Sequence, residues 1–143
     1  MGLFDALDAS GSALSAERVR MDVTAENLAN AQSTRTANGQ GPYRRKEVVM
    51  QEASAGVGPS FAASLQAARG VKVAGIVQDP TPSRRVYDPG HPDADAQGYV
   101  LMPNVNTVTE MTDLIGASRA YEANVTAMQS AKQMFTKTLD LLR

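Results

Sequence analysis

The feature that most constrains the fold is an apolar stripe along the last third of the 143-residue chain. Apolar residues recur there at intervals of three or four over more than four heptads, which is typical of a long helix that packs against another helix. The stripe consists of Met111, Leu114, Ser118, Tyr121, Val125, Met128, Lys132, Phe135, Leu139 and Leu142. We expect a helix of about 36 residues, roughly 54 Å long. A capping box of Thr107 and Glu110 is predicted at its start.

The first thirty residues predict a second helix that can cover this stripe. No proline interrupts the chain from Leu3 to about Ala31. Apolar residues recur every seven positions at Leu7, Leu14, Met21 and Leu28, whereas the alternate heptad position holds the polar residues Ser10, Glu17 and Thr24. The sequence therefore predicts two long antiparallel helices that form a coiled-coil stem. With Leu3 opposite Leu142, Glu17 and Lys132 lie about one turn out of level, and we expect them to fix register rather than add much stability.

The middle of the chain is punctuated by glycine, proline and valine and predicts a β-rich unit. Strands are expected at Tyr43–Gln51, Val71–Gln78, Arg84–Tyr87 and Tyr99–Met102. Residues 53–70 are small and polar, as in a flexible loop. The predicted class is therefore α+β. Residues 1–35 and 107–143 form a discontinuous helical stem, and residues 36–106 form the β-rich middle segment.

Composition limits what one copy of the chain can bury. Leu, Ile, Val and Phe make up 28 of the 143 residues, just under the roughly 20% below which highly charged chains are usually disordered. The formal net charge is only −1, so we expect a chain that folds but needs partners to cover its apolar surface. The absence of cysteine excludes disulfides and thiolate sites.

The same counts exclude several classes of protein. The first thirty residues carry charges and no long apolar run, so we expect neither a cleaved signal peptide nor a transmembrane segment. The pI of 5.8 does not indicate a nucleic-acid binder. The basic runs at 44–46 and 84–85 are interpreted either as solvated strand faces or as contacts with an acidic neighbour.

The loop around the single histidine is the one candidate chemical site. Asp88, His91, Asp93 and Asp95 lie close together, and the stretch from Asp93 matches the first half of a calcium-binding EF-hand loop. Position twelve of that loop is Asn104 instead of a glutamate, and the neighbouring prolines are typical of a rigid turn. We favour the turn and keep a metal-binding module at 88–95 as an alternative. Without any catalytic or phosphate-binding motif, we expect no enzyme activity, no cofactor and no small-molecule substrate.

Two terminal segments carry a resemblance to a known family. The stretch DVTAENLANAQSTR (residues 22–35) contains Asp22, Asn27, Ala29, Asn30 and Thr34. It resembles the amino-terminal signature of bacterial flagellar rod and hook proteins. The stretch EMTDLIGASRAYEANVTAMQSAKQM (residues 110–134), with Arg119, Tyr121 and Asn124, is similar to the matching terminal helix. Residues 41–50 and 71–105 resemble the short proximal-rod members of that family, so the likeness covers nearly all of the chain except 53–70.

The resemblance implies a structural role. Members of the family pass unfolded through the flagellar type III export apparatus and assemble helically into the periplasmic rod of the basal body, which transmits torque. Their terminal helices form the inner layer of the tube and their middle segments an outer layer. The implied partners are further copies of the chain, other rod proteins, the export apparatus and the basal-body ring proteins. Another short rod subunit and a freestanding coiled-coil adaptor are the remaining alternatives.

Overall fold

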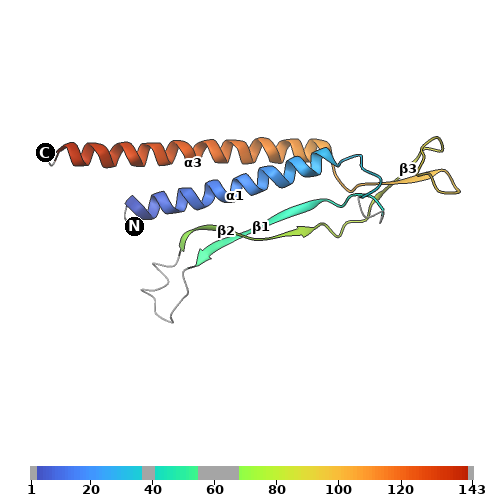
Figure 1. Ribbon diagram of the computed structural model, residues 1–143, viewed down its shortest axis with the longest axis horizontal. Coiled ribbons are helices and arrows are strands. Elements are labelled where there is room, and N and C mark those ends of the chain that lie inside the picture. The colour runs from blue at the N-terminus through green and yellow to red at the C-terminus, as the bar shows by residue number, and fades with distance from the viewer. Residues whose placement is uncertain (1–2, 37–40, 55–67, 142–143) are drawn as a thin grey trace.

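The computed structural model describes residues 3–36, 41–54 and 68–141 and has an α+β architecture. Two long helices, α1 (Leu3–Ala29) and α3 (Thr107–Leu141), lie side by side (Figure 1). Between them in sequence come four strands, which form two separate two-stranded sheets. The two predicted helices and the β-rich middle are therefore present. None of the described helices is long and apolar enough to cross a membrane.

The two helices are antiparallel, and the chain ends lie at the same end of the molecule (Figure 1). Their register is marked by an ion pair of 3.9 Å between Arg20 and Asp113. Further along, a Cβ added to Gly11 would meet Met128 Cε at 3.8 Å. Small residues let the two backbones approach closely, since Gly11 of α1 lies near Met128 and Ala117 of α3 is fully buried. The helix pair thus packs through small side chains as well as through the predicted stripe.

The first sheet pairs β1 (Lys46–Ser54) with β2 (Ala68–Gln78) in antiparallel fashion and lies along α1. The hairpin is joined to the helix by the amide of Val71, which donates to Ser12 Oγ at 3.1 Å. Gly70 has a φ of 109° there, and a Cβ at this position would clash with Ser12. Helix α1 consequently packs against α3 on one side and against the β1–β2 sheet on the other (Figure 1).

The second sheet is a short hairpin of β3 (Arg84–Tyr87) and β4 (Tyr99–Met102). It projects beyond the helix pair at the end away from the chain termini (Figure 1). The rings of Tyr87 and Tyr99 meet edge to face, 5.3 Å apart between centroids. Both strands have the predicted bounds.

The first two strands differ from their predicted bounds. Strand β1 begins at Lys46 rather than Tyr43, because residues 43–45 make contacts with the helices instead of with β2. The predicted loop 53–70 is shorter than expected, since its ends belong to β1 and β2 and pair across the sheet. Residues 55–67 of that loop lie outside the described residues.

The predicted capping box at the start of α3 is also wrong. Asn106 is the capping residue, since its side-chain oxygen accepts from the amides of Val108 and Thr109 at 3.0 and 3.4 Å. Glu110 does not turn back to the helix start. Its carboxylate is buried among side chains from α1 and from the approach to β1, which outcompete the cap.

Candidate assembly site at the helix junction

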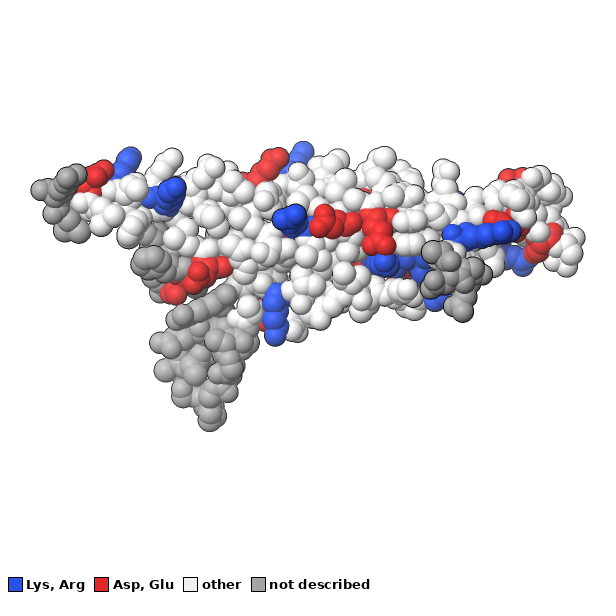
Figure 2. All heavy atoms as spheres, in the orientation of Figure 1, with Lys and Arg blue, Asp and Glu red and all other residues white. Residues whose placement is uncertain are grey.

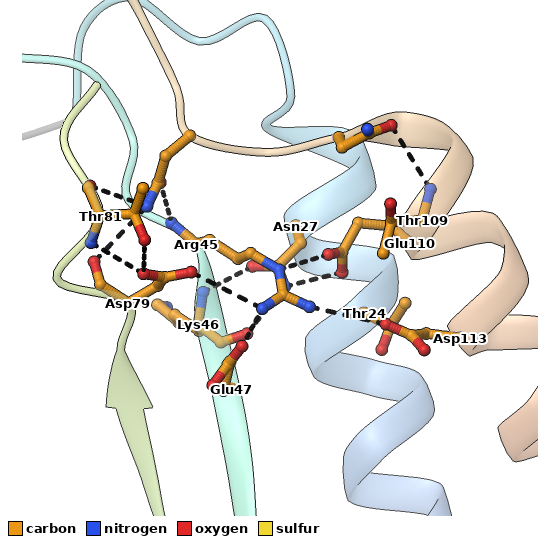
Figure 3. A network of polar contacts seen from close by, with 12 residues as sticks. Thr24, Asn27, Arg45, Lys46, Glu47, Asp79, Thr81, Thr109, Glu110 and Asp113 are labelled. Carbon is orange, nitrogen blue, oxygen red and sulfur yellow. Dashed lines mark hydrogen bonds and ion pairs between the residues drawn. The ribbon is translucent and has the colours of Figure 1, made fainter. Parts of the chain in front are cut away.

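A buried polar cluster joins the two helices to the start of β1 (Figure 3). At its centre is Asn27, which is 1% exposed. Its amide nitrogen donates to the Lys46 carbonyl at 2.8 Å and to Glu110 Oε2 at 3.0 Å. Its amide oxygen accepts from the Tyr43 hydroxyl and the Lys46 amide, each at 2.9 Å. Both donors and both acceptor positions of the side chain are therefore used, and they connect three segments distant in sequence.

Glu110 links the cluster to a buried charge pair. Its side chain is 1% exposed, and Arg45 Nε donates to Glu110 Oε1 at 2.6 Å. The same guanidinium contacts Glu47, Asp79 at 3.8 Å and Asp113 at 3.5 Å (Figure 3). One arginine thus joins β1 and the segment after β2 to the first two turns of α3.

The surroundings of the cluster shift two pKa values. Burial, with the nearby charges of Glu26 and Glu110, raises the pKa of Tyr43 to about 12, so its hydroxyl stays protonated as a donor. Burial opposes the charged form of Arg45, but the hydrogen bond and charge of Glu110 and the charge of Glu47 outweigh it and raise the arginine pKa. Both groups therefore keep one protonation state across physiological pH.

The cluster extends to the segment that precedes α3. The amide of Arg45 donates to Asn104 Oδ1 at 2.8 Å. The side-chain nitrogen of Asn104 donates to the carbonyls of Asp79 and Thr81, at 3.5 and 3.1 Å. The cluster therefore ties the chain leaving both hairpins to the helix pair.

A second polar contact anchors the β3–β4 hairpin to the end of α1. Thr34 donates to Asp93 Oδ2 at 2.7 Å, and Arg35 forms an ion pair with the same carboxylate. The hydrogen bond from Thr34 and the charge of Arg35 hold the pKa of Asp93 below its usual range. These residues line an open groove of about 790 Å³, together with Pro42 and Tyr99. Figure 2 shows charged side chains concentrated around this end of the molecule, while much of the helix pair is uncharged.

The predicted interface residues occupy mixed environments. Those that are half-buried are Leu7, Leu14, Met21, Leu28, Leu114, Tyr121, Val125 and Met128. Phe135 and Leu139 are exposed, and Leu142 lies outside the described residues. Glu17 pairs with Arg20 at 3.8 Å, while Lys132 is exposed nearer the chain termini. Their role between subunits stays a prediction.

The residues that carry the family resemblance differ in their contacts. Asn27 is the centre of the junction cluster and Thr34 anchors the hairpin. Asn30 Nδ2 donates to the Glu26 carbonyl at 2.9 Å and Asn124 Nδ2 to the Ala120 carbonyl at 2.8 Å. Of the other residues in this set, Asp22, Ala29 and Arg119 are exposed and Tyr121 is half-buried.

The acidic loop 88–95 uses its polar groups within its own turn, with strands β3 and β4, and with the end of α1. The Asp88 side chain accepts from the Gly90 amide, and His91 Nδ1 accepts from the Asp93 amide. Asp95 accepts from the Tyr99 amide at 2.9 Å and pairs with Arg85. Among the described residues, no three potential metal ligands come together. The structure thus gives the metal alternative no support.

Sequence reasoning missed most of the junction cluster. The sequence pattern places Arg45 only in a basic run and predicts only a capping role for Glu110. One signal was available: Glu110 lies one helical turn before Leu114 on the apolar stripe, a place where a lone charge requires a buried partner.

Comparisons with known proteins agree with this architecture at both ends of the chain. Residues 7–35 match the family model described as "Flagella basal body rod protein". Residues 96–141 match "Flagellar basal body rod FlgEFG protein C-terminal". The matches define a class, that of the flagellar basal-body rod proteins.

Curated relatives narrow the class to one family. The chain is 46% identical to the flagellar basal-body rod protein FlgC of Bacillus subtilis, over 99% of both chains. It is 47% identical to FlgC of Salmonella typhimurium, over 99% of this chain and 98% of that one. The FlgC protein of Borreliella burgdorferi is 43% identical over 100% of this chain and 99% of its own. The chain belongs to the FlgC family. It is a structural protein of the flagellar basal body and of bacterial motility, not an enzyme.

Proposed function

We propose that the chain is an axial subunit of the proximal rod, the part of the flagellar drive shaft that crosses the periplasm. The observation that carries this proposal is the exposed apolar surface along a long helix pair, in a chain whose relatives are named as rod proteins. Val108, Ile115 and Met134 are examples, each more than half exposed. A lone subunit leaves such surface in water, whereas a helical array of subunits buries it.

The two parts of the chain take different places in this proposal. Residues 1–35 and 107–143 form a coiled-coil stem in the inner layer of the tube, and residues 36–106 form its outer layer. In this proposal the predicted interface residues, from Leu7 to Leu142, contact other copies of the chain and other rod proteins. Torque passes between the layers through the junction cluster, because Arg45 and Asn27 connect both helices to the β1–β2 sheet.

Export fits the same physical picture. The chain leaves the cytoplasm through the flagellar export apparatus and meets the basal-body ring proteins in the periplasm. A small buried core gives a lone subunit little stability, which eases unfolding before passage. A sequence without cysteine forms no wrong disulfide in an oxidising compartment.

The test is deletion of the gene in the bacterium that encodes it, with complementation by a tagged copy. We expect deletion to abolish swimming and to leave basal bodies without a complete rod. The tagged chain should restore both and copurify with basal bodies, and gold labelling should place it in the proximal rod. Normal swimming after deletion, or basal bodies that lack the tagged chain, would contradict the proposal.

A further inference from the structure

Two glycines have no structural reason within one subunit. Gly75 lies inside β2 and Gly116 inside α3, and neither has the positive φ that favours glycine. Among the residues that the structure describes, a Cβ added at either position would meet nothing within 4 Å. Glycine inside a strand or a helix weakens that element, and it often marks a place where another chain approaches closely. Both glycines therefore point to contacts made outside the subunit.

Gly75 lies on the outward face of the β1–β2 sheet. Cross-strand pairing places Gly75 opposite Val49, with Val77 opposite Glu47 next along the same face. Val49 and Val77 are 43% and 47% exposed, so the glycine lies in an apolar surface between them. On β1 the adjacent Val48 and Met50, which point the other way, are half-buried, while Ile76 opposite Val48 on β2 is 51% exposed.

Gly116 lies beside an exposed apolar stripe on α3. Val108, Met111 and Ile115 are 71%, 52% and 54% exposed and follow the spacing of one helix face. At about 100° per residue, this face lies roughly opposite Ala117, which is fully buried. Because α1 lies between α3 and the β1–β2 sheet, the stripe and the sheet surface are on opposite sides of the molecule (Figure 1).

We infer that the Val108–Ile115 stripe of one copy docks on the outward face of the β1–β2 sheet of a second copy. The contact has room because Gly75 leaves the sheet surface open between Val49 and Val77. It joins two different surfaces, so it is heterologous, and repetition produces a ring or a helical array instead of a closed dimer. This inference rests on the proposed function and names the partner surface for it.

The positions of two opposite charges, and the directions of α3 and β2, support a contact in which the two copies point the same way. From the junction, α3 runs from Met111 to Glu122 and the sheet runs from Val77 back to Lys72, both towards the end with the chain termini (Figure 1). Each path is about 16 Å, from 1.5 Å per helical residue and 3.3 Å per strand residue. Placing Met111 on Val77 therefore brings Glu122 of one copy near Lys72 of the other. Both side chains are exposed, and in the described part of the chain neither forms an ion pair.

The chain has no cysteine, so paired cysteine substitutions report the contact directly. In cells, the double variant Gly75→Cys with Ile115→Cys should give a ladder of disulfide-linked copies in purified basal bodies after mild oxidation. The matched control, Ile115→Cys with Tyr87→Cys, uses a residue that is more exposed but lies outside both surfaces and should give at least tenfold less product. Absence of the ladder from basal bodies that contain the chain would overturn this inference and leave the proposed function intact. Basal bodies that lack even the unmodified chain would overturn both.

Charge reversal gives an independent readout. Glu122→Lys and Lys72→Glu should each lower incorporation into basal bodies at least threefold, and the double variant should restore it. Circular dichroism of the purified variants should match the unmodified chain, because both positions are on the surface. Additive loss in the double variant would overturn the predicted pairing.

Discussion

At the scale of single residues, Asn27 illustrates how a short motif contains residues with different physical roles. Asn27 and Asn30 belong to the same motif, yet only Asn27 is fully buried and bonded to two distant segments, residues 43–46 and the start of α3. Asn30 lies just after α1 and is half-buried; its side chain donates to the carbonyl of Glu26 in the last turn of the helix and accepts from Ser33. A buried polar group that loses its partner costs more than an exposed one, since water cannot replace the lost bond.

The first prediction follows from that difference. Asn27→Ala should lower the free energy of unfolding by about 2–3 kcal/mol, because the Tyr43 hydroxyl, the Lys46 amide and Glu110 each lose a buried partner. Asn30→Ala is the matched control and should cost less than about 1 kcal/mol. Urea unfolding followed by circular dichroism measures both. Equal losses in the two variants would contradict the role given to Asn27.

The second prediction concerns the charge pair of Arg45 and Glu110. A double-mutant cycle with Arg45→Met and Glu110→Gln should give a coupling energy of about 1–3 kcal/mol, because the carboxylate is fully buried and the guanidinium mostly so. The exposed pair of Lys46 and Glu26 serves as the comparison and should couple by less than about 0.5 kcal/mol. Purely additive effects at Arg45 and Glu110 would show that the contact adds nothing to stability.

Residue-level patterns predicted the junction cluster only in part. The basic run at 44–46 could be recognised, but alternation along a strand could not say which side chain is buried. The structure leaves Arg44 exposed and buries most of Arg45, because β1 begins only at Lys46 and the preceding residues turn towards the helices. Contacts between residues 65 positions apart, such as Arg45 with Glu110, are not encoded in local spacing.

At the scale of elements, helices were easier to predict than strands. The apolar periodicity of α3 extends over 35 residues, so chance errors at single positions matter little. Strands of four residues were located correctly where turn residues enclose them, as at β3 and β4. The predicted ends of β1 and β2 are wrong because residues 53–54 and 68–70, most of them small, are typical of a loop, whereas cross-strand pairing extends the sheet through them.

The third prediction tests which residue caps α3. Asn106→Ala should cost about 1 kcal/mol in the free energy of unfolding, because two amides at the helix start lose their acceptor. Thr107→Ala should change it by only a few tenths of a kcal/mol, in contrast to the role that the sequence suggested. Thermal unfolding of both variants measures these two losses and shows which residue caps the helix. A larger loss from Thr107→Ala would restore the capping box.

The fourth prediction concerns the anchor of the β3–β4 hairpin. Thr34 and Arg35 stabilise the charged form of Asp93 and place its pKa below the ordinary value of 3.8. The stabilisation is therefore complete above pH 3.8 and is lost as the pH falls through the lowered pKa of the folded state. An NMR titration of the Asp93 carboxyl should give a midpoint below 3.8 that rises in Thr34→Val. Thr36→Val, two residues away and without a bond to Asp93, is the control and should leave the midpoint unchanged.

At the scale of the whole molecule, the arrangement in three layers explains the narrow stripe on the first helix. Helix α1 contacts α3 on one side and the β1–β2 sheet on the other, so Ala16, Val23 and Thr24 are buried while the heptad leucines are only half-buried. Periodicity alone could not predict this, because small and polar residues carry no clear signal of burial. The shortage of bulky residues therefore reflects close packing within the subunit as well as surface left for neighbours.

The last prediction concerns how stability is distributed along the stem. The junction contains the fully buried side chains of Asn27 and Glu110, whereas residues 132–140 of α3 are all exposed. In the isolated subunit, amides near residues 23–27 and 110–117 should exchange slowly and those at 132–140 fast, because local opening follows the density of buried contacts. Assembly into basal bodies should remove this gradient by covering the exposed helix. Hydrogen exchange measured by mass spectrometry on both forms tests the prediction. Uniform protection along α3 in the dilute subunit would mean that the helix pair is stable without its neighbours, and the exposed face would then need another explanation.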